Sequence, residues 1–266
     1  MSVALRMGLQ RQPDVALATI ATLSVALAVA VVAVVAEAPS RGLHVGSAWS
    51  FALAGLLSPG LAQILVTVGI RESGASRVSM VFGTAPLVSV TIALIFLGEP
   101  PRAPLIAGAV LVVAGGVELA HERERPAHLN RLGLLYAFVG AALFAIRDNL
   151  VRHLAAGRTA VPPAVAAATA LVAGMVVAAT WARRRVSRRW LAFVPAGLLF
   201  GGSYVSLFEA YFRGRVTVVA PLVAAESLVG VALSALLLRD SEVVGKRLFL
   251  GAALIVAGGA LIGAFR

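Results

Sequence analysis

One carboxylate lies near the middle of a long apolar segment. Glu226 is the eleventh residue of the 23-residue run 216–238, in which every other residue is uncharged. A charged carboxylate at the centre of a bilayer costs at least about 2.5 kcal/mol on insertion scales, so it should face a cavity, hold a proton or meet a cationic partner. Two interpretations follow. Glu226 either takes up and releases a proton during function, or stays protonated and joins two helices through a hydrogen bond.

Two prolines fall inside apolar runs. Pro86 ends the segment Gly83-Thr84-Ala85-Pro86, and Pro221 precedes Glu226 by five residues. Because proline lacks an N–H, it frees a backbone carbonyl that a neighbouring helix, water or a ligand must satisfy. Thr84, Pro86 and Pro221 are therefore candidates for a substrate or coupling site, although an ordinary kink is the simpler interpretation of Pro221.

Two further segments place small and polar residues in the middle of apolar runs. One is Ser58-Pro59-Gly60, followed by Gln63, and the other is Gly201-Gly202 with Ser203 and Tyr204. Gln63, Ser203 and Tyr204 are candidates to line a cavity. Small residues are equally expected where helices pack closely, so the sequence leaves both interpretations open.

Several charged side chains follow apolar runs. Arg147, Asp148 and Arg152 come after the apolar run that begins at Leu132, and they fit either a membrane interface or a vestibule, with the interface slightly favoured. Glu209 and Arg213 are one helical turn apart and are expected to form an interfacial ion pair.

The composition excludes several classes of protein. With 60% hydrophobic residues, 13% charged residues and a mean hydropathy of +0.94, the chain has too little polar surface for a soluble globule. The formal charge of +11 comes from Arg residues between apolar runs, which suits anionic lipid headgroups and not nucleic acid. There is no Cys, and the four His show no ligand spacing, so we expect no metal and no cofactor.

The apolar runs predict an all-α, polytopic membrane protein with nine transmembrane helices. Each run can cross about 30 Å of hydrocarbon at 1.5 Å per residue, the fourth only just. The runs cover about 15–36, 46–70, 78–98, 103–120, 132–150, 160–182, 190–212, 216–238 and 248–265.

An internal repeat relates the two parts of the chain. Gly108 to Gly116 reads GAVLVVAGG and Gly251 to Gly259 reads GAALIVAGG, and a glutamate, Glu99 or Glu242, stands nine residues before each segment. The offset is 143 residues, which indicates a duplication. By this offset Glu226 corresponds to Gly83-Thr84. Both halves are therefore expected to have a weak point in a helix at the same depth in the membrane. Gly108, Gly115, Gly251 and Gly258 recur every seven residues and predict close helix packing or a homodimer contact.

The repeat divides the chain into residues 1–120, a polar connection at 121–131, and residues 132–266. Leu5-Arg6 resembles Val151-Arg152, so the first half begins where its first helix should be ending. Either the true start lies upstream, which we favour, or the protein works with four and five spans. Two five-span halves have opposite orientations in the membrane, and such inverted repeats place a substrate site near the midplane.

The repeated hairpin resembles the EamA-type permeases of the drug/metabolite transporter superfamily. The resemblance rests on Pro86, Leu97-Gly98-Glu99 and the paired glycine segments, and it extends over nearly the whole chain. It departs from the family at the missing first helix and at Leu238 to Glu242, which replaces Leu-Gly-Glu. The resemblance implies a ten-span permease, in a 5+5 plan, that moves small metabolites, often outward, and is driven by substrate or proton gradients.

The sequence as a whole is interpreted as a multi-pass permease of the inner or plasma membrane that exports a small metabolite or drug-like solute. The alternative is a structural or regulatory membrane protein; the chain lacks the motifs of an intramembrane enzyme. More Arg and Lys residues lie on the side that holds Arg71, Arg131 and Lys246, which places the N-terminus in the cytoplasm, whereas the family's topology minus one helix would place it outside.

Overall fold

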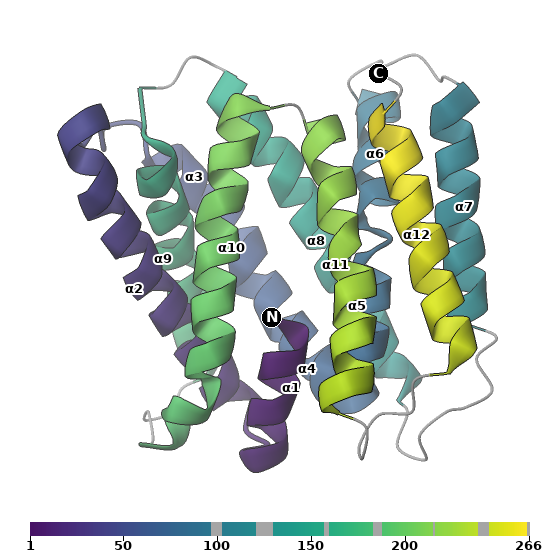
Figure 1. Cartoon of the computed structure of the whole chain (residues 1–266). Coiled ribbons are helices and arrows are strands. Elements are labelled where there is room, and N and C mark those ends of the chain that lie inside the picture. The colour runs from purple at the N-terminus through teal and green to yellow at the C-terminus, as the bar shows by residue number, and fades with distance from the viewer. Residues whose placement is uncertain are drawn as a thin grey trace.

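The computed structural model describes residues 1–96, 103–120, 130–156, 160–182, 188–214, 216–238 and 245–264, and all its regular elements are helices (Figure 1). In chain order they are α1 (Ser2–Arg11), α2 (Val15–Arg41), α3 (Trp49–Gly55), η1 (Leu56–Leu61), α4 (Ala62–Ser73), α5 (Ala75–Phe82), α6 (Ala85–Phe96), α7 (Ala103–Ala120), α8 (Arg131–Ala156), α9 (Pro163–Ala182), η2 (Arg188–Phe193), α10 (Val194–Arg213), α11 (Val216–Leu237) and α12 (Lys246–Ala264). Glu99, Glu242 and most of the 121–131 connection lie outside the described residues.

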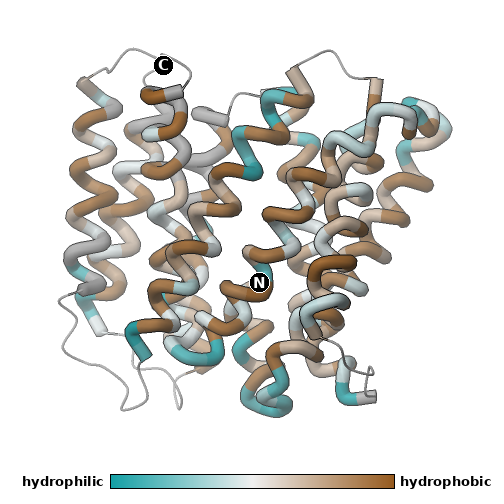
Figure 2. The backbone as a smooth tube through the Cα atoms, turned by 180° about the vertical axis from the view of Figure 1, so that it is seen from behind, coloured by the Kyte–Doolittle hydropathy of each residue, from teal (hydrophilic) through white to brown (hydrophobic). Residues whose placement is uncertain are grey.

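The helices have the length and hydropathy of a polytopic membrane protein. Five segments are long and apolar enough to cross a membrane, namely Val15–Arg41, Trp49–Ser73, Arg131–Ala156, Pro163–Ala182 and Arg189–Arg213. Shorter apolar stretches occur in α7 and α11. Hydrophobic residues dominate the middle of the helices, and hydrophilic residues gather mainly toward their two ends (Figure 2). The predicted all-α membrane fold is confirmed.

Two of the expected spans are interrupted helices. Within Trp49–Ser73, Ser58 has an extended backbone (φ −148°, ψ 120°), so the helical hydrogen bonds break between α3 and α4. The segment expected as the span 78–98 is divided between two helices, because α5 ends at Phe82 and α6 begins at Ala85. Pro86 is the second residue of α6, in the first turn of a helix, where a missing N–H leaves no bond unmade.

The matching interruption in the second half is absent from the described residues. Helix α11 continues unbroken from Val216 through Pro221 and Glu226 to Leu237. The expectation that both halves have a weak point at one depth is therefore wrong. The first half has its break at Gly83-Thr84, where the N–H of Thr84 donates to the carbonyl of Val81 at 3.0 Å.

Two helices run beyond the ends expected for them. Helix α8 continues to Ala156 instead of ending near residue 150, which places Arg147 and Asp148 inside the helix. Helix α2 continues to Arg41 and ends at Gly42, whose φ of 71° favours glycine. The residues before α2 form α1, a helix that the pattern of apolar runs did not predict.

The helices form two groups, each built from both parts of the sequence (Figure 1). One group contains α2, the broken span α3–α4, α9 and α10. The other contains α5, α6, α7, α11 and α12. Helices α1 and α8 lie between the groups and contact both. This arrangement places the middle of α8 between α10 and α11.

The repeated glycine segments pack against each other. A Cβ added at Gly115 would lie 2.5 Å from the carbonyl oxygen of Gly251, and a Cβ added at Gly258 would lie 2.5 Å from the carbonyl oxygen of Gly108. Only glycine allows the backbones of α7 and α12 to approach so closely. The predicted packing role is thus observed within one chain, between the two copies of the duplicated segment.

Candidate functional site

A cavity of 410 Å³ lies between the two helix groups. Its walls come mainly from α8, α10 and α11, with Phe82 and Ala85 at the ends of α5 and α6 and the first residues of α1 completing it. The volume falls within the range of about 300 to 1,000 Å³ that is typical of small-molecule sites. Sequence segments from both halves therefore contribute to one cavity.

The guanidinium of Arg147 is packed among aromatic rings at the α8 wall. Its Cζ atom lies 5.1 Å from the ring centroid of Phe144, 4.8 Å from that of Tyr204 and 5.9 Å from that of Phe208. Cation–π attraction of this kind strengthens when the pair is removed from water. Arg147 is 1% exposed, so the interpretation that places it at a membrane interface is wrong.

Asp148 supplies the opposite charge. One of its carboxylate oxygens lies 2.9 Å from Nε of Arg147, and the Asp148 side chain is also largely buried. Two buried opposite charges offset each other's loss of hydration, whereas either one alone would be costly. The pair therefore brings polar groups to the cavity without leaving one charge uncompensated.

Aromatic residues at every fourth position give α10 a continuous ring-bearing face. The ring centroids of Phe200 and Tyr204 are 5.4 Å apart, and those of Tyr204 and Phe208 are 4.9 Å apart. The hydroxyl of Tyr204 donates to the carbonyl oxygen of Ser58 at 3.0 Å. Tyr204 thus satisfies a carbonyl at the break of the α3–α4 span and brings together the two small-residue segments found in the sequence.

Glu226 lies on the α11 wall, opposite α8. Its side chain is exposed, and it borders both the main cavity and an adjoining space of 140 Å³ between α1 and α11. The α-amino group of Met1, which borders the same two spaces, is close enough to interact with it electrostatically. Glu226 therefore faces a space that a solute or water can enter.

The other predicted site residues divide into two sets. Ser203 is exposed and borders the cavity, and its hydroxyl donates to the carbonyl of Phe200 at 2.9 Å. Thr84 donates to the carbonyl of Val81 at 2.7 Å, and Gln63 is fully buried; neither borders the cavity. The side chains of Pro86 and Pro221 lie outside the described residues.

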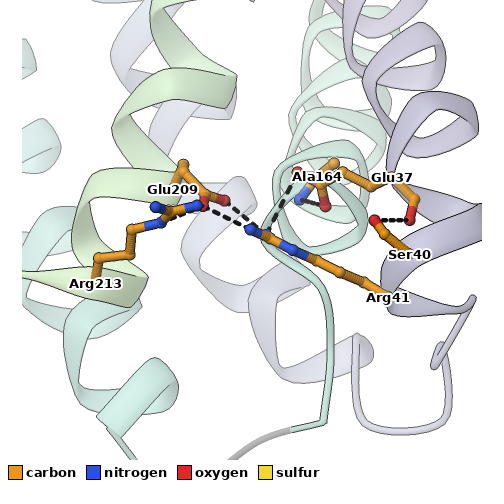
Figure 3. A network of polar contacts seen from close by, with 6 residues as sticks. All are labelled: Glu37, Ser40, Arg41, Ala164, Glu209 and Arg213. Carbon is orange, nitrogen blue, oxygen red and sulfur yellow. Dashed lines mark hydrogen bonds and ion pairs between the residues drawn. The ribbon is translucent and has the colours of Figure 1, made fainter.

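A polar network joins three helices at one end of the molecule (Figure 3). Arg41 of α2 donates to both carboxylate oxygens of Glu209 in α10, each at 2.9 Å, and Arg213 pairs with the same carboxylate. Glu37 accepts a hydrogen bond of 3.4 Å from the backbone N–H of Ala164 in the first turn of α9. The predicted Glu209–Arg213 pair is confirmed, with Arg41 as a further partner.

The sequence did not single out the phenylalanines that line the cavity. Phe82, Phe144 and Phe200 border the cavity, yet none of them was a candidate. The signal that could have found two of them is spacing, since Phe144 stands three residues before Arg147 and Phe200 four before Tyr204. Within the described part of the chain, no group of His, Asp and Glu residues could hold a metal ion.

Comparison with known proteins gives a fold and a family. A solved structure described as a crystal structure of a protein superposes with a TM-score of 0.68 at 22% sequence identity, covering 99% of this chain and 94% of that chain. This likeness shows a shared fold. No curated protein matches the chain. The model of the EamA-like transporter family matches residues 1–117 and 131–264, and the helices are those of a multi-pass membrane protein. The chain therefore belongs to the EamA-like transporter family.

Proposed function

We propose that the protein is a secondary transporter of the inner or plasma membrane that exports a small metabolite or drug-like solute. The observation that carries the proposal is the cavity between the two helix groups, with Arg147 and Asp148 on one wall and Glu226 on another. A helical membrane protein gains no stability from an open space that contains charged groups, so a solute-binding role explains it best.

The cavity favours a solute with a flat apolar part and at least one polar group. Phe82, Phe144, Phe200 and Tyr204 offer ring faces, and Ser203 and the Arg147–Asp148 pair offer hydrogen-bonding groups. Aromatic walls bind apolar or cationic groups, and a few polar groups fix their orientation.

Glu226 is the proposed coupling residue. A carboxylate that faces a cavity inside the membrane can bind a proton from one side and release it to the other. In the cycle we propose, protonation of Glu226 and binding of the solute oppose each other, so an inward proton gradient drives the solute outward. The two helix groups rock about the bound solute. The break at Ser58 allows the α3–α4 span to bend, and the break at Gly83-Thr84 does the same between α5 and α6.

The test is comparative metabolite profiling of the growth medium. Cells express the wild type, Glu226→Gln or an empty vector, with membrane abundance matched between the two proteins. We expect one or more compounds to accumulate outside wild-type cells alone. The matched control is Glu118→Gln, which removes a carboxylate near the end of α7, away from the cavity, and should export normally. Identical media from wild-type and vector cells would contradict an exporter, and normal export by Glu226→Gln would contradict the coupling role.

A further inference from the structure

An arginine of α1 holds the end of a helix in the first group. One terminal nitrogen of Arg6 donates to the carbonyl oxygens of Ile70 at 3.2 Å and Arg71 at 2.8 Å. Both acceptors lie in the last turn of α4, which ends at Ser73. The last four carbonyls of a helix lack intrahelical partners, and a cation near them is favoured by the helix dipole. Arg6 therefore joins α1 to the end of α4.

An arginine of α8 makes the corresponding contact in the second half. A terminal nitrogen of Arg152 donates to the carbonyl oxygen of Tyr211 at 3.0 Å, in the last turn of α10. Leu5-Arg6 resembles Val151-Arg152 at an offset of 146 residues, three more than the offset of the repeated glycine segments. In each half the acceptor helix ends the second span after the arginine's own helix. The two contacts thus occupy corresponding places in the two halves: in each, an arginine donates to the last turn of the same span.

The two contacts lie at opposite ends of the molecule. In Figure 1, α1 and α4 end at the lower end, whereas α8 and α10 end at the upper end. Helices α1 and α8 both lie between the helix groups and contact each of them. Each arginine therefore ties one end of an intermediate helix to the group that contains α4 and α10.

We propose that Arg6 and Arg152 are a pair of gating residues. Their hydrogen bonds to α4 and α10 break and form in alternation as the cavity opens to one side of the membrane and then to the other. This inference rests on the proposed transport cycle. Opening at the lower end requires α1 to leave α4 and move with α5 and α11, which it also contacts. Opening at the upper end requires α8 to leave α10 in the same way.

The two gates differ in strength in this conformation. Arg6 is 9% exposed and bonds two carbonyls, whereas Arg152 is part-buried and bonds one. The contact of Arg6 with α4, at the lower end of Figure 1, is therefore the stronger of the two. We expect removal of Arg6 to shift the resting protein toward opening at the α1 end, and removal of Arg152 to shift it the other way.

The absence of cysteine from the chain makes a labelling test possible. Ser203→Cys places one thiol in the cavity, and its reaction rate with a membrane-impermeant thiol reagent is measured in right-side-out and inverted vesicles. In this background, Arg6→Gln should raise the rate at least threefold in one vesicle orientation and lower it in the other. Arg152→Gln should produce the opposite pattern. A residue that only stabilised the fold would change both orientations alike.

Two variants serve as matched controls. Arg11→Gln in the last turn of α1 and Arg131→Gln at the start of α8 remove the same charge from the same helices, and both should leave the rates unchanged. If a glutamine variant does not reach the membrane, Arg6→Lys and Arg152→Lys keep the positive charge and one donating nitrogen each, and should give smaller shifts of the same signs. Equal changes in both orientations, or none, would overturn the gating role. Because labelling needs no substrate, that failure is distinguishable from a failure to find transport.

Discussion

At the scale of single residues, the Arg147–Asp148 pair places the strictest demand on the fold. Both side chains come from α8 and are largely buried, and the Arg147 guanidinium contacts aromatic rings as well as the Asp148 carboxylate. Removing one member of a buried ion pair costs about 3 to 5 kcal/mol, because the remaining charge is uncompensated, whereas replacing both is often tolerated.

We therefore expect Arg147→Leu to lower the thermal midpoint in detergent strongly, and Asp148→Leu added to it to restore at least half of the loss. The matched control is the exposed pair of neighbours Arg71 and Glu72, for which Arg71→Leu should cost no more than about 1 kcal/mol. The measurement is thermal unfolding of the purified wild type and of these three variants. A double variant no more stable than Arg147→Leu would show that the two charges do not compensate each other.

At the scale of helices, Tyr204 supports the interruption of the α3–α4 span. The break at Ser58 leaves a carbonyl oxygen that accepts the Tyr204 hydroxyl, and both residues are buried. A buried acceptor that loses its donor costs about 1 to 3 kcal/mol. Tyr204→Phe should therefore lower the free energy of unfolding by that amount, while Tyr136→Phe, at an exposed position on α8, should not. Equal stability of the two variants would mean that the carbonyl finds another partner.

The contact of α7 with α12 depends on glycine. A Cβ at position 258 would lie 2.5 Å from the carbonyl oxygen of Gly108, so the helices would have to separate. Overpacking of this kind costs about 1 to 3 kcal/mol. Gly258→Ala should lower the thermal midpoint, whereas Gly202→Ala, with no atom within 4 Å of the added Cβ, should leave it unchanged or raise it. Similar midpoints for both variants would argue against close packing as the reason for the repeated glycines.

At the scale of the whole molecule, apolar periodicity predicted the fold more fully than it predicted the cavity. The run 103–120 matches α7 at both ends, because apolar length alone defines a span. For Arg147 the interface was slightly favoured over a vestibule, because a charge after an apolar run usually ends a span. Its burial depends on Tyr204 and Phe208, more than fifty residues away, and no local pattern carries that information.

Local sequence patterns likewise predicted only part of the candidate site. Glu226 was found from its depth in an apolar run, and Ser203 and Tyr204 from their place in a small-residue segment. Gln63 and Thr84 satisfied the same criteria, yet they do not border the cavity, because the face of a span that meets a cavity depends on how neighbouring helices pack. Arg6 and Arg152 stood out only as a weak match between the halves, and their equivalence emerged from their hydrogen bonds.

The most direct test of the central claim uses the purified chain in proteoliposomes and the compound identified by metabolite profiling. An imposed pH gradient should drive that compound to accumulate above its external concentration with the wild type, and a proton ionophore should abolish the accumulation. Glu226→Gln should show no response to the gradient. Uptake equal to that of protein-free liposomes would contradict the transporter, and a full response of Glu226→Gln would contradict proton coupling at that residue.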